Sequence, residues 1–140
     1  MNDAEIKKFL EKPRLAFLTT LRKTGTPFTV PLWFEWDGSA VRMFAGAGSP
    51  KLERIRRDPR ICVTVANNLD EYEAWVTFEG TVKIVENRGK DLALSLAKVY
   101  WDTSDPKREA AYQAWDKSKE SDFCLMELRP DRTKSYAPGT

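Results

Sequence analysis

The chain has 140 residues, of which 41% are hydrophobic and 31% charged, values typical of one folded domain, so we predict a single domain over residues 1–140. Histidine is absent, which excludes Ser-His-Asp and Cys-His catalysis, histidine-ligated haem and most transition-metal sites. No apolar run reaches the roughly 18 residues that span a bilayer, and the start of the chain lacks signal-peptide character. We therefore expect a cytoplasmic protein that does not associate with membranes.

Periodicity and turn residues predict short helices among antiparallel strands. Helical spacing of apolar residues predicts helices over 4–12, 51–57, 88–101 and 107–115. Apolar runs predict strands over 14–21, 28–36, 40–45, 60–66, 74–85 and 121–128, with 132–136 as one further candidate. Asp37-Gly38 predicts a hairpin turn. The arrangement favours a mainly β fold, a small antiparallel barrel with helices packed outside.

Three local features add detail to this arrangement. Gly80 interrupts the long strand and indicates either a bulge or a close backbone approach. Cys62 and Cys124 lie in apolar strands, as buried free thiols do, so we expect no disulfide. The polar segment 67–73 is a predicted loop whose acidic side chains, including Glu71, we expect to be solvated.

The segment that follows the strand 40–45 has the features of an anion site. Gly46-Ala47-Gly48 leads into Ser49, a predicted N-cap followed by proline at the first helical position. A helix start gathers unpaired N–H groups and the positive end of the helix dipole, and Lys51 adds an ammonium group. Together with the Ser49 hydroxyl, this set suits a phosphate. The alternative is an ordinary helix cap with a solvated lysine.

A second candidate site is the stretch Thr29-Val30-Pro31-Leu32-Trp33. Because proline cannot donate to a sheet ladder, Pro31 indicates an edge or a bulge. A planar heterocycle with alternating donors and acceptors could take the free backbone groups there, with Trp33 as a wall. The alternative is a plain edge strand that carries an amphipathic tryptophan.

The remaining aromatic and charged residues give weaker signals. Five tryptophans are more than one core of this length needs, so we expect some at an interface or a stacking site. The basic run 51–60 could attract an anionic cofactor tail. No aromatic platform is interleaved with it, and the net charge is only +2, so we expect no nucleic-acid partner. No catalytic carboxylate pair and no metal-ligand spacing is present, so we predict no catalytic side chain and no metal site.

Taken in order, these motifs resemble the FMN-binding split barrels related to pyridoxamine 5′-phosphate oxidase, a family that also includes deazaflavin-dependent enzymes. The similarity covers about residues 10–86. It is carried by Gly25-x-Pro27, Val30-Pro31-Leu32-Trp33-Phe34, Asp37-Gly38, Phe44, Ser49-x-Lys51, Arg57-Asp58-Pro59-Arg60-Ile61-x-Val63 and Gly80.

The resemblance implies a six-stranded antiparallel split β-barrel with short outer helices, and a homodimer with its cofactor sites at the subunit interface. It also implies hydride transfer through the bound cofactor to or from a small-molecule substrate. Carried over by position, the cofactor-binding residues are Thr29, Val30, Pro31, Leu32, Phe44, Ala45, Ser49, Lys51 and Trp75. Of these, Ser49 and Lys51 would bind the phosphate, and Trp75 would contact the cofactor from the partner chain. The C-terminal Lys134 and Tyr136 would also approach it.

The chain departs from the vitamin oxidase branch of this family. That branch has an arginine where this chain has Thr29, and it uses a C-terminal arginine and histidine on its substrate. We therefore expect an FMN-dependent oxidoreductase that is not a true pyridoxamine phosphate oxidase. The deazaflavin coenzyme is the alternative cofactor. A non-catalytic flavin-binding or sensing protein on the same fold is a further alternative.

Overall fold

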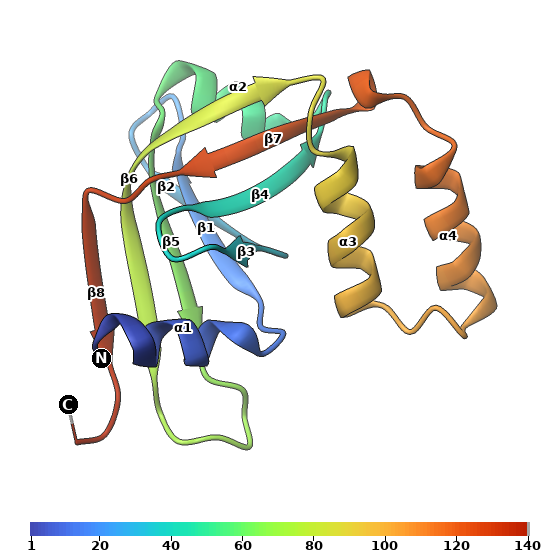
Figure 1. Ribbon diagram of the computed structural model, residues 1–140. Helices are drawn as coiled ribbons and strands as arrows, with labels where there is room; N and C mark the ends of the chain where they lie inside the picture. The colour runs from blue at the N-terminus through green and yellow to red at the C-terminus, as the bar shows by residue number, and fades with distance from the viewer. Residues whose placement is uncertain (140) are drawn as a thin grey trace.

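The computed structural model describes residues 1–139, in which one curled antiparallel sheet is surrounded by four α-helices (Figure 1). The strands are β1 (Ala16–Leu21), β2 (Pro27–Leu32), β3 (Glu35–Trp36), β4 (Val41–Gly46), β5 (Arg60–Ala66), β6 (Trp75–Glu86), β7 (Phe123–Leu128) and β8 (Arg132–Tyr136). The helices are α1 (Asp3–Glu11), α2 (Pro50–Arg57), α3 (Lys90–Tyr100) and α4 (Pro106–Asp116), with a 3-10 turn η1 (Glu120–Asp122). None of these helices combines the length and apolar character that crossing a bilayer requires.

The strand order is β2–β1–β5–β6–β7–β4–β3, with β8 added to β6. The 12-residue β6 pairs with β5 along one edge and with β8 and then β7 along the other. This architecture confirms the split-barrel class. The sheet has eight strands rather than six. The predicted strand 28–36 breaks after Leu32 into β2 and the two-residue β3, and the candidate strand 132–136 pairs with β6.

Gly80 lies where β6 changes its partner from β8 to β7. The pairing of β5 with β6 runs through Gly80 without an extra residue, so the position is not a bulge. A Cβ atom built there would lie 3.1 Å from Leu128 Cδ1 and 3.2 Å from the Asp131 nitrogen. Close approach of neighbouring chain is therefore the reason for this glycine.

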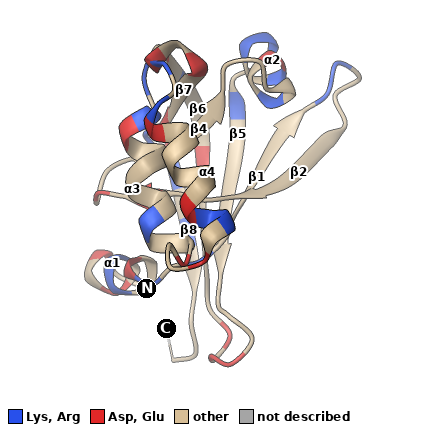
Figure 2. Cartoon of the chain, turned by 90° about the vertical axis from the view of Figure 1, so that its right-hand side faces the viewer, with Lys and Arg blue, Asp and Glu red and all other residues tan. Residues whose placement is uncertain are grey.

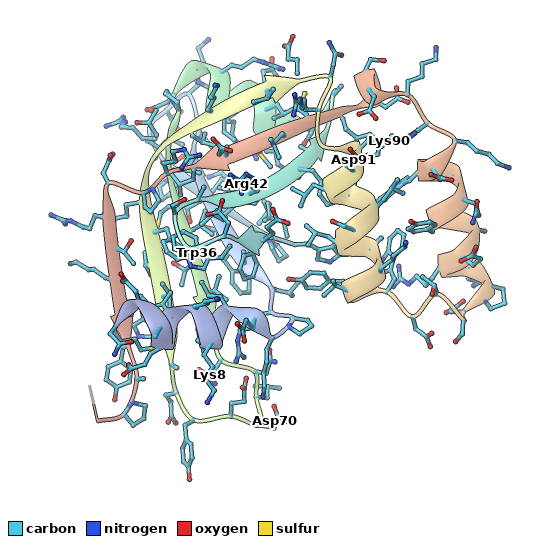
Figure 3. All side chains as sticks on the ribbon, in the orientation of Figure 1. Lys8, Trp36, Arg42, Asp70, Lys90 and Asp91 are labelled. Atoms are coloured by element: carbon cyan, nitrogen blue, oxygen red, sulfur yellow. The ribbon has the colours of Figure 1, made fainter. Side chains whose placement is uncertain are left out.

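The core lies inside the curled sheet, because alternate side chains of each strand point inward. Phe78 is fully buried and stacks on Trp36, with 4.6 Å between the ring centroids (Figure 3). At one end of the barrel α1 contributes its two buried residues, and at the other end α2 contributes Leu52 and Ile55 (Figure 1). The helical pair α3–α4 stands to one side of the sheet.

Candidate functional site

The hydrogen-bonded ladder of the sheet does not close. Strand β2 pairs only with β1, and β3 pairs only with the first two residues of β4. The second edge of segment 43–46 therefore has no strand partner among the described residues. We call this break, between β2 and segment 43–46, the split. Trp33 and Phe34 link β2 to β3 at one end of the split, and α2 begins just after β4 at the other end.

The backbone of β2 leaves polar groups at the split. The Arg22 N–H donates to the Thr26 carbonyl at 2.9 Å, which fixes the alternation of hydrogen-bonded pairs along the β1–β2 hairpin. By that alternation, the main-chain groups of Thr29 and Pro31 point away from β1 and toward the split. Since proline has no N–H, the edge presents the N–H and carbonyl of Thr29 and the carbonyl of Pro31. This donor and these acceptors fit the edge of a planar heterocycle.

The side chains of the predicted β2 residues divide between two faces. Val30 and Leu32 turn inward and pack on the core, so they do not present side chains at the outer surface. Thr29 and Pro31 are exposed, and the Thr29 hydroxyl lies 2.8 Å from that of Thr19. The structure therefore leaves Thr29 and Pro31, with their backbone, available for binding.

Two glycines at the end of β4 stand beside open space. A Cβ atom at Gly46 or Gly48 would meet nothing within 4 Å, and neither residue has a positive φ. The chain's own packing and conformation therefore do not require glycine at these positions. Close approach of a ligand to the main chain does explain them. The Gly46–Gly48 turn thus fits the phosphate end of a cofactor.

Ser49 and Lys51 follow directly at the start of α2. Ser49 is the N-cap residue, as predicted, and its side chain makes no capping hydrogen bond. Lys51 is half-buried and forms no ion pair with any described carboxylate. Burial, together with the neighbouring Arg54, lowers the pKa of Lys51. A partly desolvated cation without a counter-charge is stabilised by a bound anion, so this helix start fits a phosphate.

Two arginines extend the positive charge along α2. The Nε atom of Arg54 donates to Thr20 Oγ1 at 2.8 Å, and its guanidinium lies 4.7 Å from the Phe28 ring centroid. Arg57 donates to the Leu21 carbonyl at 3.2 Å. These partners are neutral, and the nearby carboxylate of Asp58, whose pKa Arg60 and Arg57 lower, is itself paired with Arg60. Figure 2 shows the cations of α2 beside those of the β1–β2 turn. One end of the split is therefore strongly positive.

The other end of the split adjoins a group of rings that we call the aromatic cluster. Its members are Trp33, Phe44, Tyr100, Trp101, Trp115 and Phe123. Trp33 stacks on Tyr100, with centroids 5.1 Å apart and ring planes 5° from parallel. Lys90 supports the arrangement, because its Nζ donates to two carbonyls at the end of α4, those of Asp116 (2.7 Å) and Ser118 (2.8 Å) (Figure 3).

Of the two predicted residues of β4, only Phe44 presents main-chain groups to the split, because the Ala45 N–H and carbonyl point to Cys124 on β7. The Phe44 ring belongs to the aromatic cluster, 6.0 Å from Trp33 between centroids, and Ala45 is buried in the core. Neither side chain is free to lie along a cofactor. Sequence alternation could not show this, because the cluster is completed by residues from α3, α4 and β7.

Trp75 lies on the outer face of the sheet, at the end away from α2. It stands opposite Tyr136 on β8, with 6.4 Å between ring centroids, and the two side chains are 38% and 46% exposed. Lys134 shares this face of β8, two residues before Tyr136. Within one chain these residues are not gathered with Ser49 and Lys51. Their contact with a cofactor stays a prediction that requires a second chain.

A pocket of about 530 Å³ lies on this outer face rather than at the split. Its lining includes Arg60, Cys62, Glu79 and Arg132. Arg60 is paired with Asp58, and burial is the main cause that raises the pKa of the Cys62 thiol. A protonated thiol is a poor nucleophile, so the pocket holds no activated group. It marks a hollow in the face that a second chain could cover.

The expectation that the acidic side chains of the 67–73 loop are solvated is wrong for Glu71. Its carboxylate binds the guanidinium of Arg14, which is only 4% exposed, and this pairing holds the pKa of Glu71 well below its usual range. The two residues are 57 positions apart. Neither periodicity nor a local motif signals a contact over that distance.

Comparison with known proteins decides the family. Residues 3–136 match the family model described as pyridoxamine 5′-phosphate oxidase. The chain belongs to this family. No curated protein sequence matches it significantly.

Several solved structures have a similar architecture. An F420 reductase is 24% identical over 91% of this chain and 94% of its own, with a TM-score of 0.72. General Stress Protein 26 from Bacillus anthracis is 19% identical over 95% and 92%, with a TM-score of 0.66. An FAD-binding protein from Mesorhizobium loti is 17% identical over 96% and 92%, with a TM-score of 0.65. These similarities establish the shared fold.

Proposed function

We propose that the chain binds FMN at the split and is an oxidoreductase acting on a small molecule. The observation that carries the proposal is Lys51 at the start of α2, a half-buried cation for which residues 1–139 supply no carboxylate partner. It lies next to Gly46 and Gly48, whose backbone stands beside open space. Membership of the pyridoxamine 5′-phosphate oxidase family supports a flavin, and so do the neighbours named an F420 reductase and an FAD-binding protein.

Each residue of the proposed site has a distinct task. Lys51 and the Ser49 hydroxyl bind the phosphate at the positive end of α2. The Thr29 N–H and the carbonyls of Thr29 and Pro31 contact the polar edge of the ring. Bound FMN supplies the hydride-transfer chemistry, so the chain needs no catalytic side chain. Its own contribution is to orient the ring and to exclude water on one side.

A titration of the purified protein tests the proposal. We expect added FMN to bind, with a shifted visible absorption spectrum and quenched flavin fluorescence. Gly48→Ala is the informative variant, because its Cβ is tolerated by the unliganded chain but would occupy the space beside the phosphate. We expect unchanged circular dichroism and weaker FMN binding. A wild-type protein that binds neither FMN nor F420 overturns the proposal.

A second candidate cofactor is the deazaflavin coenzyme F420. The observation that favours it is the continuation of positive charge from Lys51 to Arg54 and Arg57, since a longer anionic tail could use all three cations. Arg57→Gln separates the candidates: it should weaken binding of the longer coenzyme and leave FMN binding unchanged. If FMN binds but neither nicotinamide donors nor a substrate panel reduce it, the protein stores or senses flavin.

We further propose that the outer face of β2, β1, β5, β6 and β8 packs against a second copy of the chain. Phe17, Trp75 and Tyr136 are exposed on this face. At the centre of the sheet the same face carries threonines rather than charged side chains. Exposed aromatic side chains are enriched at subunit interfaces.

Substitution of one of these residues tests the dimer. Phe17→Glu should give a monomer in light scattering, whereas Val99→Glu, at an exposed apolar residue of α3, should leave the mass unchanged. A wild-type monomer at high concentration contradicts the dimer. If the cofactor site is shared between chains, Phe17→Glu should also lose FMN.

A further inference from the structure

The loop between β5 and β6 is fixed rather than loosely attached. The Asn67 N–H donates to the Ala74 carbonyl at 2.9 Å, and the Ala74 N–H donates to Asn67 Oδ1 at 3.1 Å. Inside the loop, the Asn68 N–H donates to Glu71 Oε1 at 2.8 Å. The loop tip nevertheless projects outward with a fully exposed Leu69. Glu71 is thus both a part of the loop's internal bonding and its connection to the rest of the domain.

That connection runs through Arg14, a buried cation between α1 and β1. Its Nη2 atom donates to Glu71 Oε2 at 2.9 Å, and its Nη1 atom donates to the other carboxylate oxygen. Its Nε atom donates to the Phe9 carbonyl at 2.9 Å, and the Phe9 ring lies 4.1 Å from the guanidinium carbon. A bidentate pair with a further hydrogen bond fixes both position and orientation. The backbone of Arg14 is therefore held from two sides.

The backbone of Arg14 in turn holds Tyr100 at the end of α3. The Tyr100 hydroxyl donates to the Arg14 carbonyl at 2.5 Å. The Tyr100 ring lies parallel to the Trp33 indole at 5.1 Å. Trp33 follows β2 directly, at the end of the split where β2 connects to β3. Direct contacts therefore lead from the loop, through a buried ion pair and a phenol, to Trp33, the residue that follows β2 beside the proposed site.

We propose that Tyr100 is a positioning residue for Trp33, and that the Glu71–Arg14 ion pair fixes Tyr100. The inference depends on the proposed function, because the place of Trp33 affects chemistry only if a planar cofactor or substrate lies along β2. Tyr100 itself need not touch that molecule. The hydrogen bond of its hydroxyl fixes the position of the ring on which the Trp33 indole stacks. It thereby fixes the position of Trp33 and the width of the split at the end where β2 connects to β3.

The first test needs no cofactor. In protein labelled with 5-fluorotryptophan, the five tryptophans give separate fluorine resonances, and loss of one in Trp33→Phe identifies Trp33. We expect Tyr100→Phe, which removes only the hydroxyl, to move the Trp33 resonance. Glu71→Gln should move it in the same direction. Two matched controls, Tyr112→Phe on α4 and Asp70→Asn beside Glu71, should leave it in place.

An unmoved Trp33 resonance in Tyr100→Phe overturns the inference. Should Glu71→Gln fail to fold because Arg14 loses its counter-charge, Tyr100→Phe still decides.

The second test measures FMN affinity in the same variants. We expect Tyr100→Phe to raise the dissociation constant about tenfold and to shift the absorption of bound flavin, since small displacements of a preorganised wall weaken binding. Tyr112→Phe should match the wild type in both measurements. A moved Trp33 resonance with unchanged FMN affinity and spectrum contradicts the positioning role. Absence of FMN binding in the wild type contradicts the proposed function instead, and the fluorine test remains decisive for the contact.

Discussion

Two cations of this chain, Arg14 and Lys51, are both shielded from water but differ in their partners. Arg14, 4% exposed, has both oxygens of Glu71 and the Phe9 carbonyl as partners. Lys51 is half-buried and has no carboxylate partner among the described residues. Lys51 lies in the first turn of α2 and Arg14 follows α1, so both are close to a helix end of the same small barrel.

The contrast teaches where to look for a ligand. Burial of a charge is unfavourable in free energy unless the charge is paired. At Arg14 the chain supplies the partner itself, as structural sites do. At Lys51 the desolvation of the charge is not offset by a partner among the described residues, and the two nearby glycines are not required by packing. An unpaired cation beside unoccupied backbone is the pattern of a site completed by an anion from outside. The following predictions test this contrast between Arg14 and Lys51.

The largest effect is expected at the paired cation. Arg14→Ala removes both guanidinium hydrogen bonds of the Glu71 carboxylate, which keeps only the exposed Lys12 at 3.3 Å and the Asn68 N–H as described partners. We expect the free energy of unfolding to fall by about 3 kcal/mol, the lower end for buried ion pairs, because Glu71 keeps some contact with water. Urea denaturation measures it. A loss no greater than that of Lys51→Ala removes the contrast.

Lys51→Ala should affect binding rather than folding. We expect unchanged or slightly increased stability, since a partly desolvated charge disappears, and FMN affinity weaker by about 1–3 kcal/mol. Isothermal titration calorimetry gives the affinity. Arg56→Ala is the matched control, because Arg56 lies on the same helix but pairs with Glu86 at 3.3 Å. Equal losses in both variants indicate general attraction by the helix and not a phosphate site.

Glycine substitutions test the same distinction, between a position that matters for folding and a position that matters for ligand binding. Gly89 has a φ of +110°, and a Cβ there would lie 2.8 Å from the Cys124 carbonyl oxygen, so Gly89→Ala should cost at least about 1–2 kcal/mol of stability. Gly48→Ala meets no atom and should be neutral or stabilising by up to about 1 kcal/mol. Thermal unfolding of the two variants distinguishes them. Comparable losses contradict the open space at Gly48.

The smallest effect concerns pH. The phosphate contact needs the protonated ammonium of Lys51, and the pKa of that group is lowered, mainly by burial. FMN affinity should therefore decrease as pH rises toward 10, starting at lower pH than for an ordinary lysine. Lys51→Arg keeps its charge throughout this range, so its affinity should depend less on pH. Fluorescence titrations between pH 7 and 10 compare the two, since ionisation of the flavin itself is common to both.

Most of the fold could be predicted because its signals are local. The helix at 50–57 is bounded by the Ser49 N-cap, Pro50 and Asp58-Pro59, and the turn at Asp37-Gly38 joins β3 to β4, with Gly38 at a φ of +97°. Proline at position 31 correctly indicated an edge strand. These features depend on backbone preferences of a few adjacent residues.

The unpredicted part of the site depends on contacts between distant segments. Trp33 was expected to wall a bound ring beside Pro31, which stays a prediction; the sequence did not signal that the indole stacks on Tyr100, 67 positions further along the chain. The Phe44 ring joins residues of α4 and β7. Alternation assigns a residue to a face, yet it cannot say which distant ring covers that face. The role of Trp75 depends on a second chain and stays a prediction.

Helix α4 buries none of its residues, and its ring contacts to the barrel pass through Trp115 alone. A segment held in this way can detach while the sheet remains intact, because little apolar surface is lost. Its amide protons should therefore exchange with deuterium well before those of β5 and β6. Each such excursion would transiently expose the indoles of the aromatic cluster, so detachment of α4 is an expected route to proteolysis and to self-association during storage.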